Sequence, residues 1–280
     1  MTTALRSVRL PDGALVPCLG QGTWRMGEDS ARRAQEIAAL RRGVELGLTL
    51  IDTAEMYGDG GAEELLAEAL RGQRDKVFLV SKAYPQNGAG AALRRACENS
   101  LRRLSTDRID LYLLHWRGSA PLAATVEGMT ALQREGKIRY WGVSNFDADD
   151  MTELFDAGGA GCASNQVLYN LQRRGVEYDL LPEMVARGIP AMAYSPIEQG
   201  RLPTTGALAE VGRRLGATIN QVALAWVLRR PDVIVIPKAA TIAHVTENRG
   251  AFDVTLDEPA LAALDRAFPP PRRKAPLAML

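Results

Sequence analysis

Eight short apolar runs recur at a nearly regular interval along the chain, and this recurrence constrains the fold more than any other feature of the sequence. The runs lie near positions 19, 49, 77, 109, 138, 162, 190 and 233. Most successive runs are about 24–32 residues apart, the length of one strand, one helix and two loops. Units of this kind place parallel strands next to one another through right-handed helical crossovers. We therefore predict an α/β fold, a (β/α)₈ TIM barrel, with a doubly wound open sheet as the alternative.

The segments between the runs predict helices, and the N-terminal segment predicts a hairpin. Residues 30–46 and 61–70 carry apolar side chains at helical spacing, and the last interval between runs contains two such patterns, at 208–215 and 219–228. Two more helical patterns follow the eighth run. Pro11-Asp12-Gly13 separates two apolar runs and predicts an N-terminal β-hairpin ahead of the barrel. No change in composition divides the chain, so we predict a single domain over residues 1–280.

Charge and cysteine content exclude several functional classes. The 34 Lys and Arg residues nearly balance the 33 Asp and Glu residues, so the net charge of +1 creates no overall field that would attract nucleic acid or a membrane. No apolar stretch approaches the roughly 18 residues of a membrane span, and the N-terminus lacks the apolar region of a signal peptide. Cys18, Cys97 and Cys162 are far apart and predict neither a disulfide framework nor a metal site. We expect a cytoplasmic protein.

Ionisable residues follow three consecutive apolar runs, where buried parallel strands are normally apolar. Asp52 follows Leu50-Ile51, Lys82 follows Val80-Ser81, and His115 follows Leu113-Leu114. In a barrel the carboxyl ends of the strands share one mouth, where active sites are built, so these side chains should converge. Tyr57 lies five residues after Asp52 on the same loop. We interpret the four residues as a catalytic group, against the alternative of helix caps and structurally satisfied polar groups.

The chemistry of this group points to proton transfer. A free phenol has a pKa near 10, and we expect Lys82 to favour the phenolate while Asp52 pairs with Lys82. His115 is then placed to donate a hydrogen bond to a substrate oxygen. The group contains no Ser or Cys nucleophile and no metal motif, so we predict that Tyr57 protonates a carbonyl oxygen while a cofactor supplies hydride.

At these residues the sequence resembles the aldo-keto reductase family essentially from end to end. The motifs that carry the resemblance are Ile51-Asp52-Thr53-Ala54 with Tyr57-Gly58, Asp110 to Trp116, Gly142-Val143-Ser144-Asn145-Phe146, Asn165-Gln166-Val167, Ala193-Tyr194-Ser195-Pro196, and Ile236-Pro237-Lys238 with Glu247-Asn248. Within the family, the pattern is most similar to small bacterial members of the methylglyoxal reductase type. The resemblance implies that Tyr57 is the general acid, that Lys82 and Asp52 tune it, and that His115 orients the carbonyl.

The resemblance also implies a dinucleotide that lies extended over the barrel mouth. Ser144, Asn145 and Gln166 match residues that bind the nicotinamide carboxamide, and Tyr194 matches the ring stacked beneath it. Lys238 matches a residue that binds the 2′-phosphate of NADPH. Ala239 and His244 depart from the Ser and Arg that are frequent at their positions, so NADPH is expected, with NADH as the alternative. The full set of expected cofactor residues is Gly22, Thr23, Trp24, Asp52, Ser144, Asn145, Gln166, Tyr194, Ser195, Pro196, Ile197, Gln199, Ile236, Lys238, Ala239, His244, Glu247 and Asn248.

Short specificity loops predict a small, open substrate pocket. Trp24, Met56 and Trp116 are expected to line it beside Tyr57 and His115. Such a pocket suits small aldehydes, 2-oxoaldehydes or ketones, bound by a monomer. Two other functions stay open from the residues alone. Lys82 could form a Schiff base, as in an aldolase or lyase, or the chain could be a redox-sensing regulatory subunit that binds NADPH and turns over slowly.

Overall fold

One parallel sheet forms the centre of the protein, and the computed structural model describes it within residues 5–280. Residues 1–4 of the predicted domain lie outside the described part. The sheet strands follow chain order and are β3 (Gln21–Gly22), β4 (Leu50–Asp52), β5 (Phe78–Ala83), β6 (Ile109–Leu114), β7 (Ile138–Ser144), β8 (Cys162–Leu168), β9 (Ala191–Tyr194) and β10 (Val233–Val235). Parallel bridges from Leu19 to Val235 and from Gly22 to Lys238 join the first strand to the last. The sheet therefore curls back on itself, and the predicted α/β barrel is confirmed.

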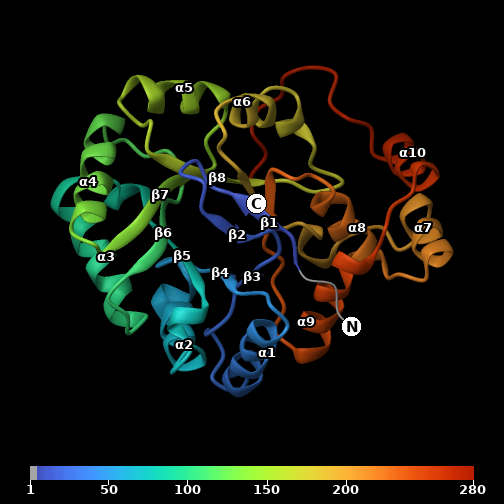
Figure 1. Ribbon diagram of the computed structural model, residues 1–280, viewed down its shortest axis with the longest axis horizontal. Coiled ribbons are helices and arrows are strands. Elements are labelled where there is room, and N and C mark those ends of the chain that lie inside the picture. The colour runs from blue at the N-terminus through green and yellow to red at the C-terminus, as the bar shows by residue number, and fades with distance from the viewer. Residues whose placement is uncertain (1–4) are drawn as a thin grey trace.

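Helices surround this sheet (Figure 1). They are α1 (Arg33–Glu45), α2 (Gly61–Ala69), α3 (Gly90–Arg103), α4 (Leu122–Arg134), α5 (Ala148–Asp156), α6 (Leu180–Ala186), α7 (Ala207–Leu215), α8 (Ile219–Leu228), α9 (Ile242–Gly250) and α10 (Glu258–Ala267). The interval between β9 and β10 holds two helices, as the sequence predicts, and α7 packs beside α10 at the periphery. Gly47, Gly136 and Gly188 follow α1, α4 and α6 with positive φ values of 88°, 73° and 68°. They end these helices at little steric cost because glycine has no Cβ.

The predicted N-terminal hairpin is present and covers the end of the barrel where the strands begin. Its strands are β1 (Ser7–Arg9) and β2 (Leu15–Pro17), which pair antiparallel with Val8 opposite Val16. The Tyr140 hydroxyl, near the start of β7, donates to the carboxylate of Asp12 at the hairpin tip at 2.8 Å. The hairpin closes this end of the barrel, so the carboxyl ends of the strands are left to form a site.

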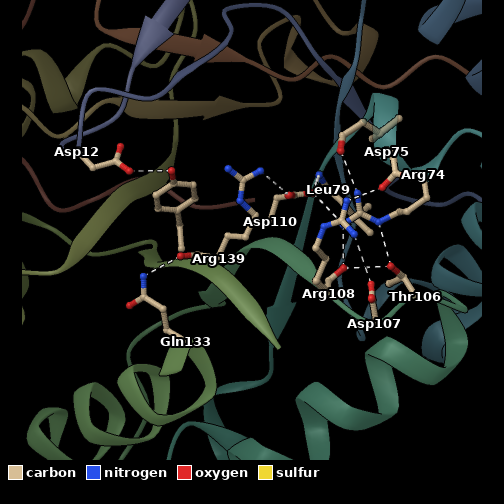
Figure 2. Close-up of polar contacts among 12 residues, drawn as sticks. Asp12, Arg74, Asp75, Leu79, Thr106, Asp107, Arg108, Asp110, Gln133 and Arg139 are labelled. Atoms are coloured by element: carbon tan, nitrogen blue, oxygen red, sulfur yellow. Dashed lines mark hydrogen bonds and ion pairs between the residues drawn. The ribbon is translucent and has the colours of Figure 1, made fainter. Parts of the chain in front are cut away.

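A buried carboxylate joins neighbouring strands at the same end of the barrel (Figure 2). Asp110, the second residue of β6, accepts hydrogen bonds from the Leu79 backbone at 2.9 Å and from Arg74 at 2.8 Å. Arg139 at the start of β7 also pairs with Asp110, at 3.3 Å. These contacts lie at the opposite end of β6 from His115 and tie β5, β6 and β7 together.

Candidate active site

The three residues predicted from the strand ends converge with Tyr57 at the barrel mouth, and we call these four residues the tetrad. Asp52 ends β4, Lys82 lies near the end of β5, His115 follows β6, and Tyr57 begins the 3₁₀ turn Tyr57–Gly60. The Lys82 side chain is 0% exposed, and its Nζ donates to Asp52 Oδ2 at 2.8 Å, to the Thr53 carbonyl at 2.8 Å and to Tyr57 Oη at 3.0 Å. These contacts use all three ammonium protons. Because the phenol oxygen accepts from Lys82, the phenol hydrogen points away from Lys82.

The electrostatics of the phenol differ from the sequence prediction. Burial raises the pKa of Tyr57 well above 10, and the charge of Asp52 raises it further. The sequence predicts that Lys82 favours the phenolate, but in the structure the carboxylate paired with that ammonium offsets its charge. The phenol therefore keeps its proton at neutral pH, which is the state that a proton donor requires.

Burial also sets the charge state of His115. Desolvation, followed by the charge of Lys82, lowers the pKa of His115 to about 2. The ring lies against Tyr57, with centroids 5.8 Å apart, and against Trp116 at 5.0 Å. His115 is therefore neutral at physiological pH, and it offers one N–H donor to a ligand rather than a positive charge.

This neutral histidine should make the stability of the protein pH-dependent. Between pH 6.5 and 5 the unfolded chain binds a proton at His115 and the folded protein does not, so stability falls as the pH falls. We expect His115 to account for about 1.5 kcal/mol of the loss over this interval. Urea unfolding at the two pH values measures the loss, and His115→Gln should reduce it by that amount. An equal loss in the variant would show that His115 takes up a proton as readily in the folded protein as in the unfolded chain.

A cavity of about 740 Å³ opens above the tetrad. Trp24 forms one wall, with its ring 4.9 Å from the Tyr57 ring in an edge-on arrangement. Most of the predicted site residues line the cavity. They are Gly22, Trp24, Asp52, Met56, Tyr57, His115, Trp116, Ser144, Asn145, Gln166, Tyr194, Ser195, Pro196, Ile197, Gln199, Ile236, Lys238, His244, Glu247 and Asn248.

Two predicted cofactor residues, Thr23 and Ala239, are not among the residues that line the cavity. The Thr23 hydroxyl donates to the Asp52 carbonyl at 3.0 Å and so supports the tetrad from behind, whereas Ala239 is buried. Lys82 does not line the cavity either, because its amine is enclosed by Asp52, Tyr57 and the Thr53 carbonyl. The sequence analysis missed five lining residues, which are Arg25, Gly200, Asn220, Met279 and Leu280.

Hydrogen bonds link the predicted nicotinamide residues to one another and to the tetrad. Tyr194 Oη donates to Asn145 Oδ1 at 2.9 Å, and Asn145 Nδ2 donates to the His115 carbonyl at 3.1 Å. Gln166 Nε2 donates to Asp52 Oδ1 at 2.7 Å. The carboxylate that holds Lys82 is thus itself oriented from the opposite side of the barrel.

Basic residues gather at the far end of the cavity. Lys238 follows β10, and burial lowers its pKa. The negative charge of Glu36 opposes this shift, and the positive charges of Arg32 and Arg25 add to it. His244 lies in the first turn of α9, where its backbone N–H donates to the Thr241 hydroxyl. This end can hold an anion, while the tetrad end combines a proton donor with aromatic walls.

The fold and this site define the chain as an aldo-keto reductase. The sequence profile of the Aldo/keto reductase family matches residues 18–268, so the chain belongs to that family and is an oxidoreductase. It is 54% identical to the methylglyoxal reductase YeaE of Escherichia coli, over 95% of each chain. It is 29% identical to the glyoxal reductase of Bacillus subtilis, over 95% of this chain and 94% of that protein.

Solved structures show the same similarity. An aldo/keto reductase from Klebsiella pneumoniae, crystallised with NADP and acetate, is 54% identical and superposes with a TM-score of 0.96 over 99% of this chain and 100% of that chain. The thermostable aldo-keto reductase Tm1743, in complex with the inhibitor epalrestat, is 39% identical with a TM-score of 0.88, over 93% and 98% of the two chains.

Within residues 5–280, no helix is long and apolar enough to cross a membrane. The described part of the chain also contains no group of three or more potential metal-ligating His, Cys, Asp or Glu side chains.

Proposed function

We propose that this protein uses NADPH to reduce small aldehydes, 2-oxoaldehydes or ketones to alcohols, with Tyr57 as the general acid. The observation that carries the proposal is the hydrogen bond from buried Lys82 to Tyr57, at the floor of a cavity of about 740 Å³. The names of the relatives, methylglyoxal reductase and glyoxal reductase, support 2-oxoaldehydes as the substrate class. A panel of carbonyl compounds assayed with NADPH and with NADH tests the proposal. Failure to oxidise NADPH with any of them would contradict it.

The residues around the cavity fit a dinucleotide cofactor. Amide and hydroxyl groups of Ser144, Asn145 and Gln166 face the tetrad end beside the Tyr194 ring, and Lys238 lies at the basic end. When bound, the reduced dinucleotide supplies hydride to the carbonyl carbon. Lys238, Glu247 and Asn248, which line the other end of the cavity, would hold its adenosine part. The Klebsiella relative that was crystallised with NADP supports NADPH as the cofactor.

The tetrad then supplies the proton that the carbonyl oxygen takes up. His115 donates its N–H to the carbonyl oxygen and orients the substrate, and Tyr57 gives its proton to the same oxygen as negative charge develops there. The phenolate that remains lies 3.0 Å from Lys82 Nζ, which stabilises it. Asp52 holds the ammonium in place, and Trp24 and Trp116 form aromatic walls beside the reacting atoms.

The basic end of the cavity predicts the cofactor preference. Lys238→Ala should weaken NADPH binding by about 10–100-fold, the value of one lost hydrogen bond to a charged group, and should change NADH binding little. Fluorescence titration with both cofactors measures the two dissociation constants. Lys76→Ala, which removes an exposed lysine outside the cavity, is the control and should change neither constant. Equal weakening of NADPH and NADH binding by Lys238→Ala would show that Lys238 does not bind the 2′-phosphate.

The environment of Lys82 argues against the Schiff-base alternative. Its amine is buried, donates three hydrogen bonds and does not line the cavity, so no carbonyl carbon can approach it without breaking the tetrad. Borohydride treatment in the presence of a carbonyl substrate should therefore leave Lys82 unmodified.

The second alternative is a regulatory subunit that binds NADPH and turns over slowly. We expect rapid repeated turnover of free aldehydes, and single-turnover behaviour would instead favour the regulatory subunit.

A further inference from the structure

A buried ion pair lies behind the tetrad, on the other face of the strand that carries Lys82. Ser81 and Lys82 are consecutive in β5, so their side chains point to opposite faces of the strand. The Ser81 hydroxyl donates to Glu63 Oε1 at 2.6 Å, and Glu63 Oε2 pairs with Arg103 at 2.7 Å. The Glu63 side chain is 0% exposed. None of these three side chains lines the cavity, and the proposed reaction uses none of them.

The same ion pair also packs against the segment that carries Tyr57. Directly after Tyr57, the residues Gly58, Asp59 and Gly60 have φ values of 58°, 52° and 94°. Gly58 and Gly60 adopt these angles at little steric cost because glycine has no Cβ. The strain of this connection therefore falls on Asp59, which needs support from its surroundings. Arg103 lies tightly against Gly60, since a Cβ added to that glycine would be 2.5 Å from Arg103 Cδ. The arginine therefore packs on the segment while its guanidinium holds Glu63.

We propose that Glu63 and Arg103 are positioning residues that set the separation between Tyr57 Oη and Lys82 Nζ. The inference rests on the proposed function. Glu63 is tied to the Lys82 strand through Ser81, and Arg103 is tied to the tyrosine segment through Gly60. The ion pair between them therefore joins the loop after β4, which carries Tyr57, to strand β5, which carries Lys82. A change in this link displaces the phenol relative to the ammonium without touching substrate or cofactor.

Glu63 also acts on the charge of Lys82. Burial lowers the pKa of Lys82, whereas the negative charges of Asp52 and Glu63 oppose that shift. The other titratable or charged groups that face Lys82 or Glu63 are Tyr57, His115, Arg103, Cys97 and Tyr112. Removal of the Glu63 charge should therefore allow Lys82 to lose its proton at a lower pH. A purely structural role for the ion pair would not change this titration.

The first test is Glu63→Gln, which keeps an acceptor for Ser81 and removes the charge. We expect kcat to fall about tenfold, with KM and the NADPH dissociation constant within about twofold of wild type. The alkaline limb of the kcat–pH profile should move to lower pH by about 0.5–1 unit. Arg103→Lys preserves a cation and should recover part of kcat relative to Arg103→Met.

A second variant tests the link to the strand if Glu63→Gln folds poorly. Ser81→Ala keeps both charges and removes only the hydrogen bond, so kcat should fall while the alkaline limb stays in place. Asp110→Asn is the matched control, because it changes an equally buried ion pair with Arg74 at the opposite end of the barrel (Figure 2). It should lower the unfolding free energy and leave kcat and the pH profile unchanged.

The outcomes separate this inference from the proposed function. Unchanged kcat and an unchanged pH profile in both Glu63→Gln and Ser81→Ala would overturn the positioning role. So would an equal loss of kcat in Asp110→Asn with no movement of the alkaline limb in Glu63→Gln. Neither result would affect the assignment of Tyr57, which the Tyr57→Phe variant tests separately.

Discussion

Tyr57→Phe should lower kcat for carbonyl reduction by about 10²–10⁴-fold, the usual contribution of a positioned general acid. The substitution removes only the hydroxyl. The ring remains edge-on to Trp24 and beside His115, so the walls of the cavity persist. Lys82 still donates to Asp52 and to the Thr53 carbonyl, so the floor of the site should also keep its shape. We therefore expect the variant to bind NADPH with nearly the wild-type dissociation constant.

Two measurements together test this prediction. Steady-state turnover of a 2-oxoaldehyde gives kcat, and fluorescence titration gives the NADPH dissociation constant. Tyr84→Phe is a suitable control, because its phenol is outside the cavity-lining set and should leave kcat unchanged. Near wild-type turnover in Tyr57→Phe would remove this residue from the mechanism.

Lys82→Met should abolish turnover and destabilise the fold by about 3–5 kcal/mol, because it leaves Asp52 buried without its ammonium partner. Burial already raises the pKa of Asp52, with Lys82 opposing that shift, so the unpaired carboxyl should take up a proton in the variant. Urea unfolding at neutral pH measures the loss of stability, and a larger loss is expected as the pH rises and the carboxyl is forced to ionise.

The double variant Lys82→Met with Asp52→Asn separates stability from catalysis. It removes both charges, so most of the lost unfolding free energy should return. Activity should not return, because no cation remains to stabilise the phenolate. Equal stability of the single and double variants would show that the unpaired Asp52 carboxyl costs Lys82→Met no stability. An active Lys82→Met variant would contradict the mechanism.

The barrel could be predicted from the sequence because its strands are buried on both faces and therefore appear as apolar runs. Helices separate these runs at a nearly regular interval. Even β3 and β10, with two and three residues in regular pairing, lie in apolar runs that the spacing identifies. The hairpin followed from Pro11-Asp12-Gly13 between two apolar runs. The convergence of Asp52, Lys82 and His115 could also be predicted, because the carboxyl ends of parallel barrel strands meet at one mouth. That prediction requires no knowledge of side-chain contacts.

Other features of the site depend on tertiary packing, and most of them left no pattern in the sequence. Met279 and Leu280 line the cavity only because the tail folds back across the barrel mouth. Arg25 carried one available signal, a cation directly after Trp24 on the loop that follows β3. The direction of the Tyr57 pKa shift depends on burial weighed against a neighbouring charge pair, and spacing alone cannot supply that balance.

The most direct test of the account is a crystal structure of this chain with NADP⁺ bound. We expect the dinucleotide to lie extended over the carboxyl ends of the strands, with its nicotinamide on the Tyr194 ring and its 2′-phosphate at Lys238. Tyr57 Oη should remain on Lys82 Nζ and face the carbon that delivers hydride. A dinucleotide bound elsewhere, or a Tyr57 hydroxyl turned away from that carbon and from Lys82, would contradict the account.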